Sequence, residues 1–268
     1  MAELPPTGAS DRALLSVRDL SLRFGGVAAL DGVSFDIAVG QIVGLIGPNG
    51  AGKTSLFNCV SRLYQPTSGG IRFDEHDLLA VRPHQVIRLG IARTFQNVAL
   101  FGRMSVLDNV LVGDHARIGT RVLASAFQIG STRRAERSAR TRALAALDVV
   151  GLTGQAEALA GSLPFAIQKR VELARALVSQ PRLLLLDEPA GGLNHTEVRE
   201  LSGLIRRIHA QYHLTVLLVE HHMNLVMSIS DHVVVLSFGR KIAEGAPGSV
   251  RNDPAVIEAY LGASSAVA

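Results

Sequence analysis

Hydrophobic and polar residues alternate along residues 14–37, a period of two that is typical of half-buried β-strands. The pairs Gly25-Gly26 and Asp31-Gly32 interrupt this alternation and predict turns, so we expect antiparallel strands here. Residues 41–47 are mostly apolar, as in a short strand that is buried on both faces. A glycine-rich turn follows, and an amphipathic helix is expected from about residue 52 to about residue 63.

The middle of the chain, residues 105–158, has a different pattern. Its apolar residues recur at helical spacing and no strand pattern of comparable strength is present, so we expect an inserted helical lobe. This lobe carries a row of arginines, which we interpret as the solvated surface of a helix. The row consists of Arg133, Arg134, Arg137, Arg140 and Arg142.

Beyond residue 162, short apolar segments alternate with amphipathic ones. We expect strands at residues 183–187, 214–220 and 232–238. We expect helices at about 194–212, from the end of the second of these strands to about 229, and at 253–262. Apolar strands that alternate with helices indicate a largely parallel sheet covered on both faces. The second half of the chain is therefore predicted to be an α/β structure.

Composition limits the class of protein. The chain has 268 residues, of which 47% are hydrophobic and 19% charged, enough for a large domain core and too apolar for disorder throughout. The formal net charge is only +4, a surplus that does not by itself indicate nucleic-acid binding. We expect one large domain, or a core with a smaller appended lobe.

Cysteine content and hydropathy bear on the compartment. The lone Cys59 excludes an internal disulfide framework and a four-thiolate zinc site, and it indicates a reducing compartment. No apolar run approaches the roughly 18 to 20 residues that span a bilayer, and the first 13 residues lack a secretory pattern. We therefore expect a cytosolic chain whose membrane role, if it has one, comes through partners.

The strongest motif lies between the predicted strand at 41–47 and the helix after it. Residues 47–54 match G-x-x-x-x-G-K-[ST], in which glycines let backbone N–H groups surround a phosphate and the lysine adds a positive charge. The helix N-terminus adds partial positive charge at the same point. The predicted nucleotide-binding residues here are Gly47, Pro48, Asn49, Gly50, Ala51, Gly52, Lys53, Thr54 and Ser55.

Two carboxylates follow the strand of four leucines. Asp187 and Glu188 emerge where α/β sheets bind ligands, at the carboxyl ends of the strands. Asp187 can hold Mg²⁺ through water together with the Thr54 hydroxyl, and Glu188 is placed to accept a proton from an attacking water. Together with residues 47–54, the pair predicts a site that hydrolyses a nucleoside triphosphate.

The order of these motifs resembles the ATP-binding subunits of ABC transporters, from residue 14 onward. The resemblance rests on residues 47–54, then Gln96, then a signature-like segment at 162–177, LLLLDEP at 183–189, AGGLN at 190–194 and VEHHM at 219–223. It implies that Gln96 and His221 are catalytic beside Glu188, His221 contacting the γ-phosphate. It implies that Gln96 is also a Mg²⁺ ligand and that Phe24 stacks on adenine.

The resemblance also implies a fold and its division. The expected fold class is α/β, a P-loop NTPase cassette with a mainly parallel sheet, an N-terminal antiparallel β subdomain and an inserted α-helical subdomain. The expected division is a flexible leader at 1–12, one ATPase domain at 13–262 and a tail at 263–268. Within that domain, we expect a RecA-like core at about 13–100 and 180–250, a helical subdomain at about 101–179 and a C-terminal helix at 253–262.

Details of the sequence are similar to one subfamily, the ATPases of branched-chain (hydrophobic) amino-acid importers. These details are LPFAIQKR at residues 163–170, against the subfamily's L-P-Y-G-x-Q-K-R signature, Asn194 after the Asp187 strand, and V-I-x-A-Y-L-G at residues 256–262. The subfamily implies ATP and Mg²⁺ as cofactors and a peripheral place on the cytoplasmic face of the membrane. It implies a second, often distinct ATPase subunit, two membrane permeases and an extracytoplasmic solute-binding protein as partners, and no nucleic acid.

The departure from the family signature that bears on nucleotide contact is Ala166. The residues expected to act on the partner's nucleotide are Leu163, Pro164, Phe165, Ala166 and Gln168, and Ala166 stands where the family has glycine. If this residue needs a left-handed backbone, the strain is on the order of 1–2 kcal/mol. The resemblance therefore implies a weaker site on the partner subunit, where this signature acts.

Three other readings stay open from the sequence. A soluble ABC-type ATPase that acts on nucleic acid or the ribosome would usually carry tandem cassettes, coiled coils or zinc-binding cysteines. A GTPase or small-molecule kinase shares the phosphate-binding motif, but the chain has no Asn-Lys-x-Asp motif. A nucleotide-binding regulator with impaired hydrolysis would account for Ala166. The solute, the direction of transport and the identity of the second cassette are not determined by the sequence.

Overall fold

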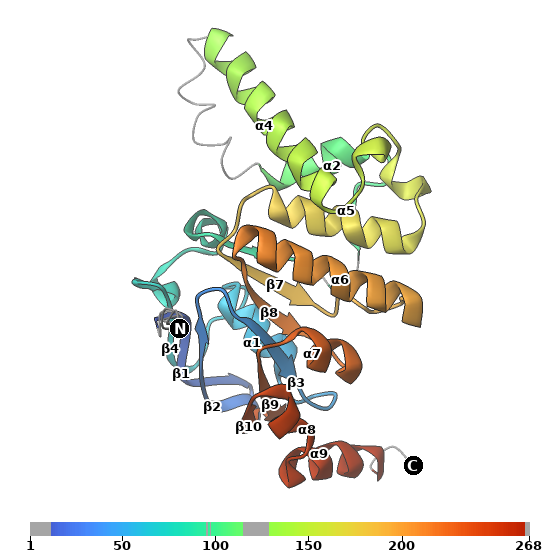
Figure 1. The fold of residues 1–268 in the computed structure, drawn as a ribbon. Helices are drawn as coiled ribbons and strands as arrows, with labels where there is room; N and C mark the ends of the chain where they lie inside the picture. Colours follow the sequence, from blue (N-terminus) through green and yellow to red (C-terminus); the bar gives the residue numbers. More distant parts are fainter. Residues whose placement is uncertain (1–11, 95, 97, 115–128, 266–268) are drawn as a thin grey trace, which may run out of the picture.

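The computed structural model describes residues 12–94, 96, 98–114 and 129–265. Apart from residue 12, the expected leader lies outside this description, as do residues 266–268 of the expected tail. The described strands form two sheets, and helices cover the larger one (Figure 1).

The smaller sheet is antiparallel and has the order β2-β1-β4-β5. Its strands are β1 (Ala13–Phe24), β2 (Val27–Ala38), β4 (Ser68–Phe73) and β5 (His76–Asp77). The predicted antiparallel pair and its turn at Gly25-Gly26 are confirmed. The turn predicted at Asp31-Gly32 is wrong, because these residues lie inside β2. There the pairing shifts between Leu20↔Val33 and Leu22↔Leu30, so the dipeptide is a bulge.

The larger sheet has the order β10-β9-β3-β8-β7-β6. Its strands are β3 (Ile42–Ile46), β6 (Ile91–Arg93), β7 (Leu183–Asp187), β8 (Thr215–Val219), β9 (His232–Ser237) and β10 (Arg240–Gly245). All neighbours are parallel except β10, which pairs antiparallel with β9. The predicted parallel sheet is confirmed, whereas β4, β5, β6 and β10 were not predicted.

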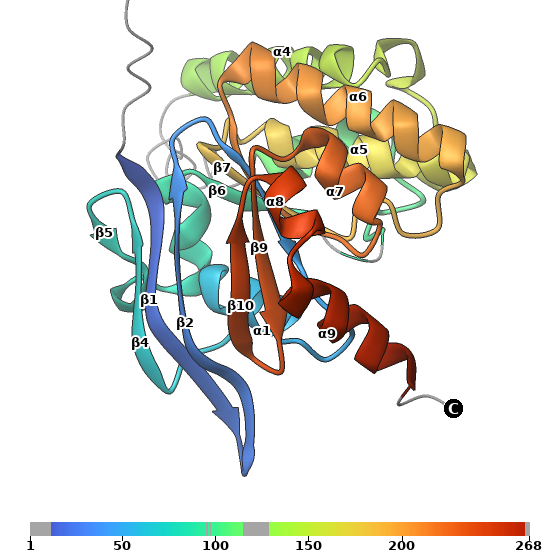
Figure 2. The same cartoon turned by 60° about the horizontal axis from the view of Figure 1, so that its bottom comes forward.

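The parallel strands are buried on both faces, which explains their continuous runs of Leu and Val. In β7, for example, Leu184 and Leu186 point into a core shared with the covering helices, and Leu183 and Leu185 into a second core. The second core lies between the two sheets and includes helix α1 (Lys53–Val60). Figure 2 shows the smaller sheet beside β9 and β10.

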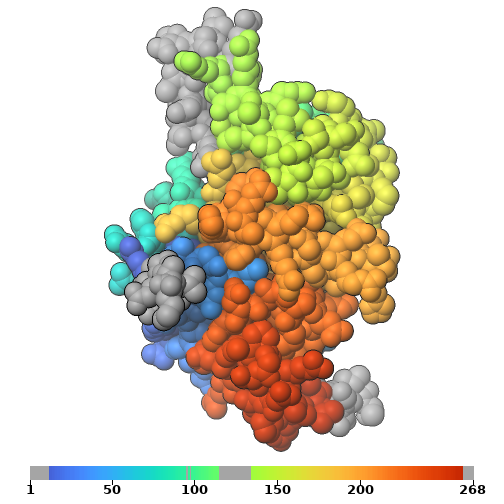
Figure 3. All heavy atoms as spheres, viewed as in Figure 1, coloured from blue at the N-terminus to red at the C-terminus, as the bar shows by residue number. Residues whose placement is uncertain are grey.

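The described α-helices besides α1 fall into three groups. The inserted segment contributes α2 (Val106–Gly113), α4 (Ile129–Val149) and α5 (Phe165–Leu177); the second half contributes α6 (His195–Tyr212) and α7 (Met223–Ile229); α8 (Pro247–Arg251) and α9 (Pro254–Ser265) end the chain. Helices α2, α4 and α5 form the upper part of the molecule and α9 its lower end (Figures 1 and 3). The predicted helical lobe is confirmed.

Two helix predictions need correction. Helix α1 ends at Val60 rather than near residue 63, because Arg62 has a left-handed backbone with φ +60°. In the arginine row of α4, Arg134, Arg137 and Arg140 are exposed as predicted, whereas Arg142 pairs with the fully buried Asp114. The side chain of Arg133 lies outside the described part of the chain. Among the described residues, none of the helices has the length and hydropathy to cross a membrane.

Candidate nucleotide-binding site

The loop that follows β3 leads directly into α1, and its shape requires glycine. At Gly47 (φ +151°) a Cβ atom would lie 2.1 Å from the carbonyl oxygen of Leu236. At Gly52 (φ +102°) it would lie 2.5 Å from the carbonyl oxygen of Ala29. Side chains are therefore excluded from the two positions where this loop passes closest to its neighbours. The rest of the loop, Pro48, Asn49, Gly50 and Ala51, runs between them.

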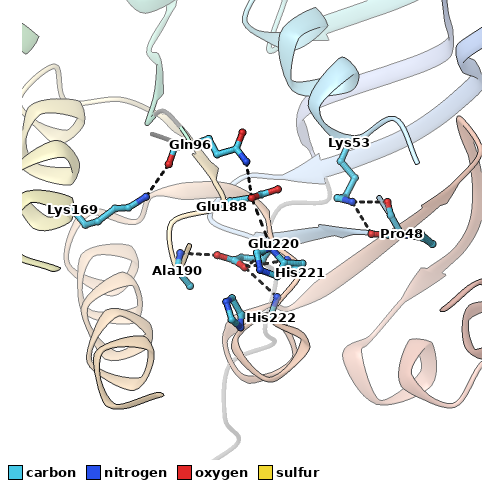
Figure 4. Close-up of polar contacts among 10 residues, drawn as sticks. Pro48, Lys53, Gln96, Lys169, Glu188, Ala190, Glu220, His221 and His222 are labelled. Carbon is cyan, nitrogen blue, oxygen red and sulfur yellow. Dashed lines mark hydrogen bonds and ion pairs between the residues drawn. The ribbon is translucent and has the colours of Figure 1, made fainter. Parts of the chain in front are cut away.

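Lys53 is the first residue of α1 and points back at the loop. Its Nζ donates hydrogen bonds to the carbonyl oxygens of Gly47, at 2.7 Å, and of Pro48, at 2.8 Å (Figure 4). Burial lowers the pKa of the Lys53 ammonium, and the Glu188 carboxylate partly offsets this effect. The exposed Thr54 follows it in the same turn. An ammonium group and a helix N-terminus therefore meet at one loop, an arrangement suited to an anion.

The three predicted catalytic side chains come from loops after three neighbouring strands. Gln96 follows β6, Glu188 follows β7, and His221 comes shortly after β8. Gln96 Nε2 donates to Glu188 Oε2 at 2.9 Å, and His221 Nδ1 lies 3.8 Å from the same oxygen (Figure 4). Glu188 has φ +45°, and its backbone N–H donates to the Val219 carbonyl oxygen at 2.9 Å. The sheet thus brings Gln96 and His221, which are 92 and 33 residues away from Glu188 in the sequence, to the Glu188 carboxylate.

Asp187 ends β7 and is held by a residue that the sequence did not single out. Its Oδ2 accepts a hydrogen bond from Arg93 Nη2 at 2.7 Å in a nearly buried ion pair. Arg93 Nη1 donates to Asn58 and Ser61, at the end of α1 and just beyond it. Arg93 is the last residue of β6, a strand too short to leave a pattern in the sequence. Through these bonds, Arg93 holds the Asp187 side chain in a fixed position relative to α1.

The three predicted Mg²⁺ ligands, Thr54, Gln96 and Asp187, offer a hydroxyl, an amide oxygen and a carboxylate. Mg²⁺ prefers hard oxygen ligands of these kinds and keeps several waters. Asp187 lies at the carboxyl end of β7 and Thr54 in the first turn of α1, and these two elements contact each other. The donor set therefore fits the ion.

Glu220 is a second residue that the sequence analysis missed. Its side chain is completely buried and accepts hydrogen bonds from three backbone N–H groups. Ala190 N donates to Oε1 at 2.7 Å, and the N atoms of His221 and His222 donate to Oε2 at 3.0 and 3.2 Å (Figure 4). A signal for it existed, because Glu220 follows the apolar strand β8 as Glu188 follows β7.

The signature-like segment lies at the start of α5. Leu163 and Pro164 precede the helix, Phe165 begins it, and Gln168 Nε2 donates to the Leu163 carbonyl oxygen at 2.8 Å. Ala166 has an ordinary helical backbone, so the left-handed conformation considered above is not adopted and its methyl group causes no strain. Figure 4 places α5, through its Lys169, on the opposite side of Glu188 from Lys53.

Phe24, at the end of β1, is half-exposed and is partnered by an aromatic ring that the sequence analysis did not consider. The ring of Tyr64 meets it edge-on, with centroids 5.2 Å apart and an interplanar angle of 77°. Edge-to-face pairs of this kind are favourable, so Tyr64 restrains the orientation of Phe24. The pair offers an exposed apolar surface of the kind on which a planar base stacks.

Comparisons with known proteins agree on one family. Residues 30–191 match the family model described as "ABC transporter", and residues 240–266 match "Branched-chain amino acid ATP-binding cassette transporter". The chain is 46% identical to the high-affinity branched-chain amino acid transport ATP-binding protein BraF of Pseudomonas aeruginosa, over 94% of this chain and 98% of that protein. It is 44% identical to LivG of Escherichia coli, a protein with the same description, over 93% and 98%.

The fold has close counterparts among solved structures. A crystal structure of the ADP conformation of an ATP-binding cassette from an ABC transporter superposes with a TM-score of 0.81 at 30% identity, covering 94% of this chain and 99% of that one. A nucleotide-free cassette superposes with a TM-score of 0.80 at 28% identity, covering 93% and 99%.

Proposed function

Because the chain belongs to the ABC transporter family of ATP-binding cassettes, we propose that residues 47–55 bind the phosphates of ATP and that Glu188 is the base for its hydrolysis. The chain is an ATPase of this family. One observation carries the assignment of roles: Gln96 and His221, from different loops, both lie against the Glu188 carboxylate, at 2.9 and 3.8 Å.

Binding starts from groups that already face the loop after β3. The Lys53 ammonium, now bonded to two loop carbonyls, exchanges them for oxygens of the β- and γ-phosphates. Backbone N–H groups of residues 47–55, with the helix N-terminus behind them, surround the same phosphates. Phe24, oriented by Tyr64, stacks on the adenine.

Hydrolysis follows from the position of Glu188. A water oxygen attacks the γ-phosphorus in line with the bond to the leaving β-phosphate oxygen, and that bond breaks. Glu188 accepts a proton from the water, Gln96 orients the carboxylate through its amide, and His221 donates to a γ-phosphate oxygen. Thr54, Gln96 and Asp187 would hold Mg²⁺, which when bound neutralises charge on the phosphate oxygens.

The transported solute and the partners follow from the relatives and the subfamily signature. We assign the chain to the uptake of branched-chain or other hydrophobic amino acids, because proteins of that description share 44–46% of their residues with it. It would work on the cytoplasmic face of the membrane with a second ATPase subunit, two permeases and a solute-binding protein. Leu163, Pro164, Phe165, Ala166 and Gln168 would act on the nucleotide of that second subunit.

We also propose the domain division expected from the sequence, which the order of the elements supports except that α9 continues to Ser265, into the expected tail. The core, at about 13–100 and 180–250, holds both sheets, and α2, α4 and α5 fall within the helical subdomain at about 101–179. A C-terminal helix at 253–262 corresponds to α9. In this division, Gln96 lies at the boundary of the core and Lys169 within the helical subdomain.

The test of the proposed function is Glu188→Gln, which keeps the size of the side chain but removes the base. We expect ATP to bind with a Kd within about twofold of wild type while turnover falls by roughly 10²-fold or more, the range that general bases contribute. The matched control is Glu157→Gln, the same change at an exposed surface carboxylate of the helical subdomain. Turnover at the wild-type rate in Glu188→Gln would remove Glu188 from its assigned role.

A further inference from the structure

The two loops that carry Glu188 and His221 are joined by a third side chain. Glu188 belongs to the loop after β7, and His221 to the loop after β8. The carboxylate of Glu220 accepts from Ala190 in the first loop and from His221 and His222 in the second (Figure 4). One carboxylate therefore sits at the junction of the segments that hold the two side chains.

The three hydrogen bonds that join the two loops require a carboxylate at position 220. Glu220 is fully buried, and each of its oxygens is used, Oε1 by one N–H and Oε2 by two. A carboxylate has two acceptor oxygens and no donor, so it can satisfy all three N–H groups at once. Hydrogen bonds to an ionised acceptor are also about twice as strong as neutral ones. Glutamine has one acceptor oxygen and would turn an NH₂ group toward at least one of these donors.

We propose that Glu220 is a positioning residue, which sets the distance between the Glu188 carboxylate and the His221 ring by tying their two loops together. The inference rests on the roles of Glu188 and His221 in the proposed function. Ala190 is two residues beyond Glu188, so movement of its N–H away from Glu220 moves the base. The His221 N–H belongs to the same residue as the catalytic ring, so the same release moves the ring.

A residue that merely supports the fold would behave differently. Loss of general stability lowers the amount of folded protein but leaves the turnover of each folded molecule unchanged. A positioning residue lowers kcat, because misplacement of a reacting group by about 1 Å costs up to roughly 10²-fold in rate. It leaves the KM for ATP within about twofold, since the phosphate contacts proposed for Lys53 and the loop after β3 come from another strand and do not pass through Glu220.

The experiment is a double-mutant cycle between Glu220→Gln and His221→Ala in the full-length chain, assembled with its transporter partners. In the wild-type background we expect Glu220→Gln to lower kcat by roughly tenfold to a hundredfold with the KM for ATP within about twofold. In the His221→Ala background it should lower kcat by a clearly smaller factor, because the His221 ring, one of the two groups whose distance Glu220 sets, is already gone.

The matched control is Asp231→Asn. Asp231 Oδ2 also accepts a backbone N–H from a neighbouring segment, that of Ile42 at 2.8 Å, but at the opposite end of the sheet. Its kcat should equal that of wild type. If Glu220→Gln does not fold, as judged by circular dichroism, Glu220→Asp takes its place in the same cycle, because it keeps both oxygens but shortens their reach.

The outcomes separate the proposal from its premise. Losses that multiply independently in the double variant, or a raised KM with unchanged kcat, would overturn the role of Glu220 and leave that of His221 intact. An unchanged kcat in His221→Ala alone would overturn the role of His221 and the inference with it. A loss for Asp231→Asn equal to that for Glu220→Gln would show that any such link matters, and would also overturn the inference.

Discussion

Ala166 occupies the second position of α5, where the family signature has glycine. Its backbone is helical, so the extra methyl group introduces no strain within its own chain. Alanine also favours a helix over glycine by up to about 1 kcal/mol, which makes the residue locally stabilising. We therefore expect any cost of the methyl group to fall on the nucleotide of the proposed second subunit, which the start of this helix would approach.

Replacing Ala166 by glycine tests whether that cost exists. We expect Ala166→Gly to raise ATP turnover of the assembled transporter, by at most ~10²–10³-fold, the effect of a complete transition-state donor. It should lower the free energy of unfolding by no more than about 1 kcal/mol. The measurements are steady-state ATPase rates and urea unfolding of the chain.

The control for this change is Ala255→Gly, at the exposed second position of helix α9. It makes the same substitution in the same helical position, at the other end of the molecule (Figure 1). Turnover in this variant should match wild type. An unchanged rate in Ala166→Gly would reject the asymmetry between the two nucleotide sites.

At the scale of elements, Arg93 connects three of them. From the end of β6 it bonds Asp187 of β7 and Asn58 of α1, and its guanidinium lies 5.6 Å from the centre of the Phe57 ring. Removing one partner of a buried ion pair leaves the other charge uncompensated. We expect Arg93→Met to lower the free energy of unfolding by about 3–5 kcal/mol, measured by urea denaturation.

An exposed ion pair provides the comparison. Arg140 pairs with Glu157 across the helical lobe, but both side chains are more than half exposed. Such pairs contribute little, so Arg140→Met should change the free energy of unfolding by less than about 1 kcal/mol. Equal losses for Arg93→Met and Arg140→Met would contradict the view that the buried pair joins α1 to the sheet.

Lys169 connects α5 to the loop that carries Gln96. It is buried, and its Nζ donates to the Gln96 carbonyl oxygen at 3.1 Å (Figure 4). Burial lowers the pKa of the Lys169 ammonium, an effect opposed by the surrounding carboxylates, Glu172 first among them. Because Gln96 in turn contacts Glu188, we expect a displacement of the helical lobe to reach the proposed base through this bond.

We expect Lys169→Met to lower ATP turnover about tenfold, the equivalent of one charged hydrogen bond, while ATP affinity stays within about twofold. Lys169→Arg should restore part of the rate, because it keeps a donor. The control is Lys241→Met, whose lysine pairs with Glu244 on the edge strand β10. A loss of ATP affinity in Lys169→Met, with turnover unchanged at saturating ATP, would contradict this coupling.

The sequence predicted those elements whose signal is local. The loop at 47–54, the strand ending in Asp187 and the alternating strands β1 and β2 each follow from spacing within a few residues. Short edge elements such as β6 and β10 leave no such pattern, since their pairing depends on neighbours far along the chain. The sequence Asp31-Gly32 is typical of a turn, and it was predicted as one because only the pairing of β2 with β1 on both sides of it shows that it is a bulge.

The candidate site could be predicted only in part, and the reason is similar. Lys53 and Glu188 stand within recognisable motifs, so the roles that we propose for them could be formulated from the chain alone. Arg93 and Glu220 act through contacts with segments between 30 and 94 residues away. Contacts of that length are set by the strand order of the sheet, which spacing along the sequence does not reveal.

At the scale of the whole molecule, strand order decides which loops can meet. Strands β3, β8 and β7 are neighbours and run parallel, so the loops after them emerge at one edge of the sheet. That edge gathers Lys53, His221 and Glu188, as ligand sites in open α/β sheets generally do. The helical lobe reaches the same edge through Lys169, so we expect a nucleotide bound there to be coupled to the core and to the lobe together.

This arrangement predicts a strong effect of nucleotide on the stability of the whole chain. A ligand that binds only the folded state at about 100 times its Kd stabilises it by about 2.7 kcal/mol. For a chain of this size, each kcal/mol raises the Tm by about 2–4 °C, so Mg²⁺ and ATP should raise it by roughly 5–10 °C. Glu188→Gln is the background of choice, because ATP is not consumed during heating, and EDTA should reduce the shift.

Lys53→Ala in that background should abolish the shift at the same ATP concentration, because the phosphates lose the ammonium group that faces them. Lys241→Ala, which removes a lysine from the edge of the sheet, should retain it. Thermal unfolding followed by circular dichroism measures all three variants. An undiminished shift in Lys53→Ala would mean that the loop after β3 does not hold the triphosphate, and the roles assigned around it would fall together.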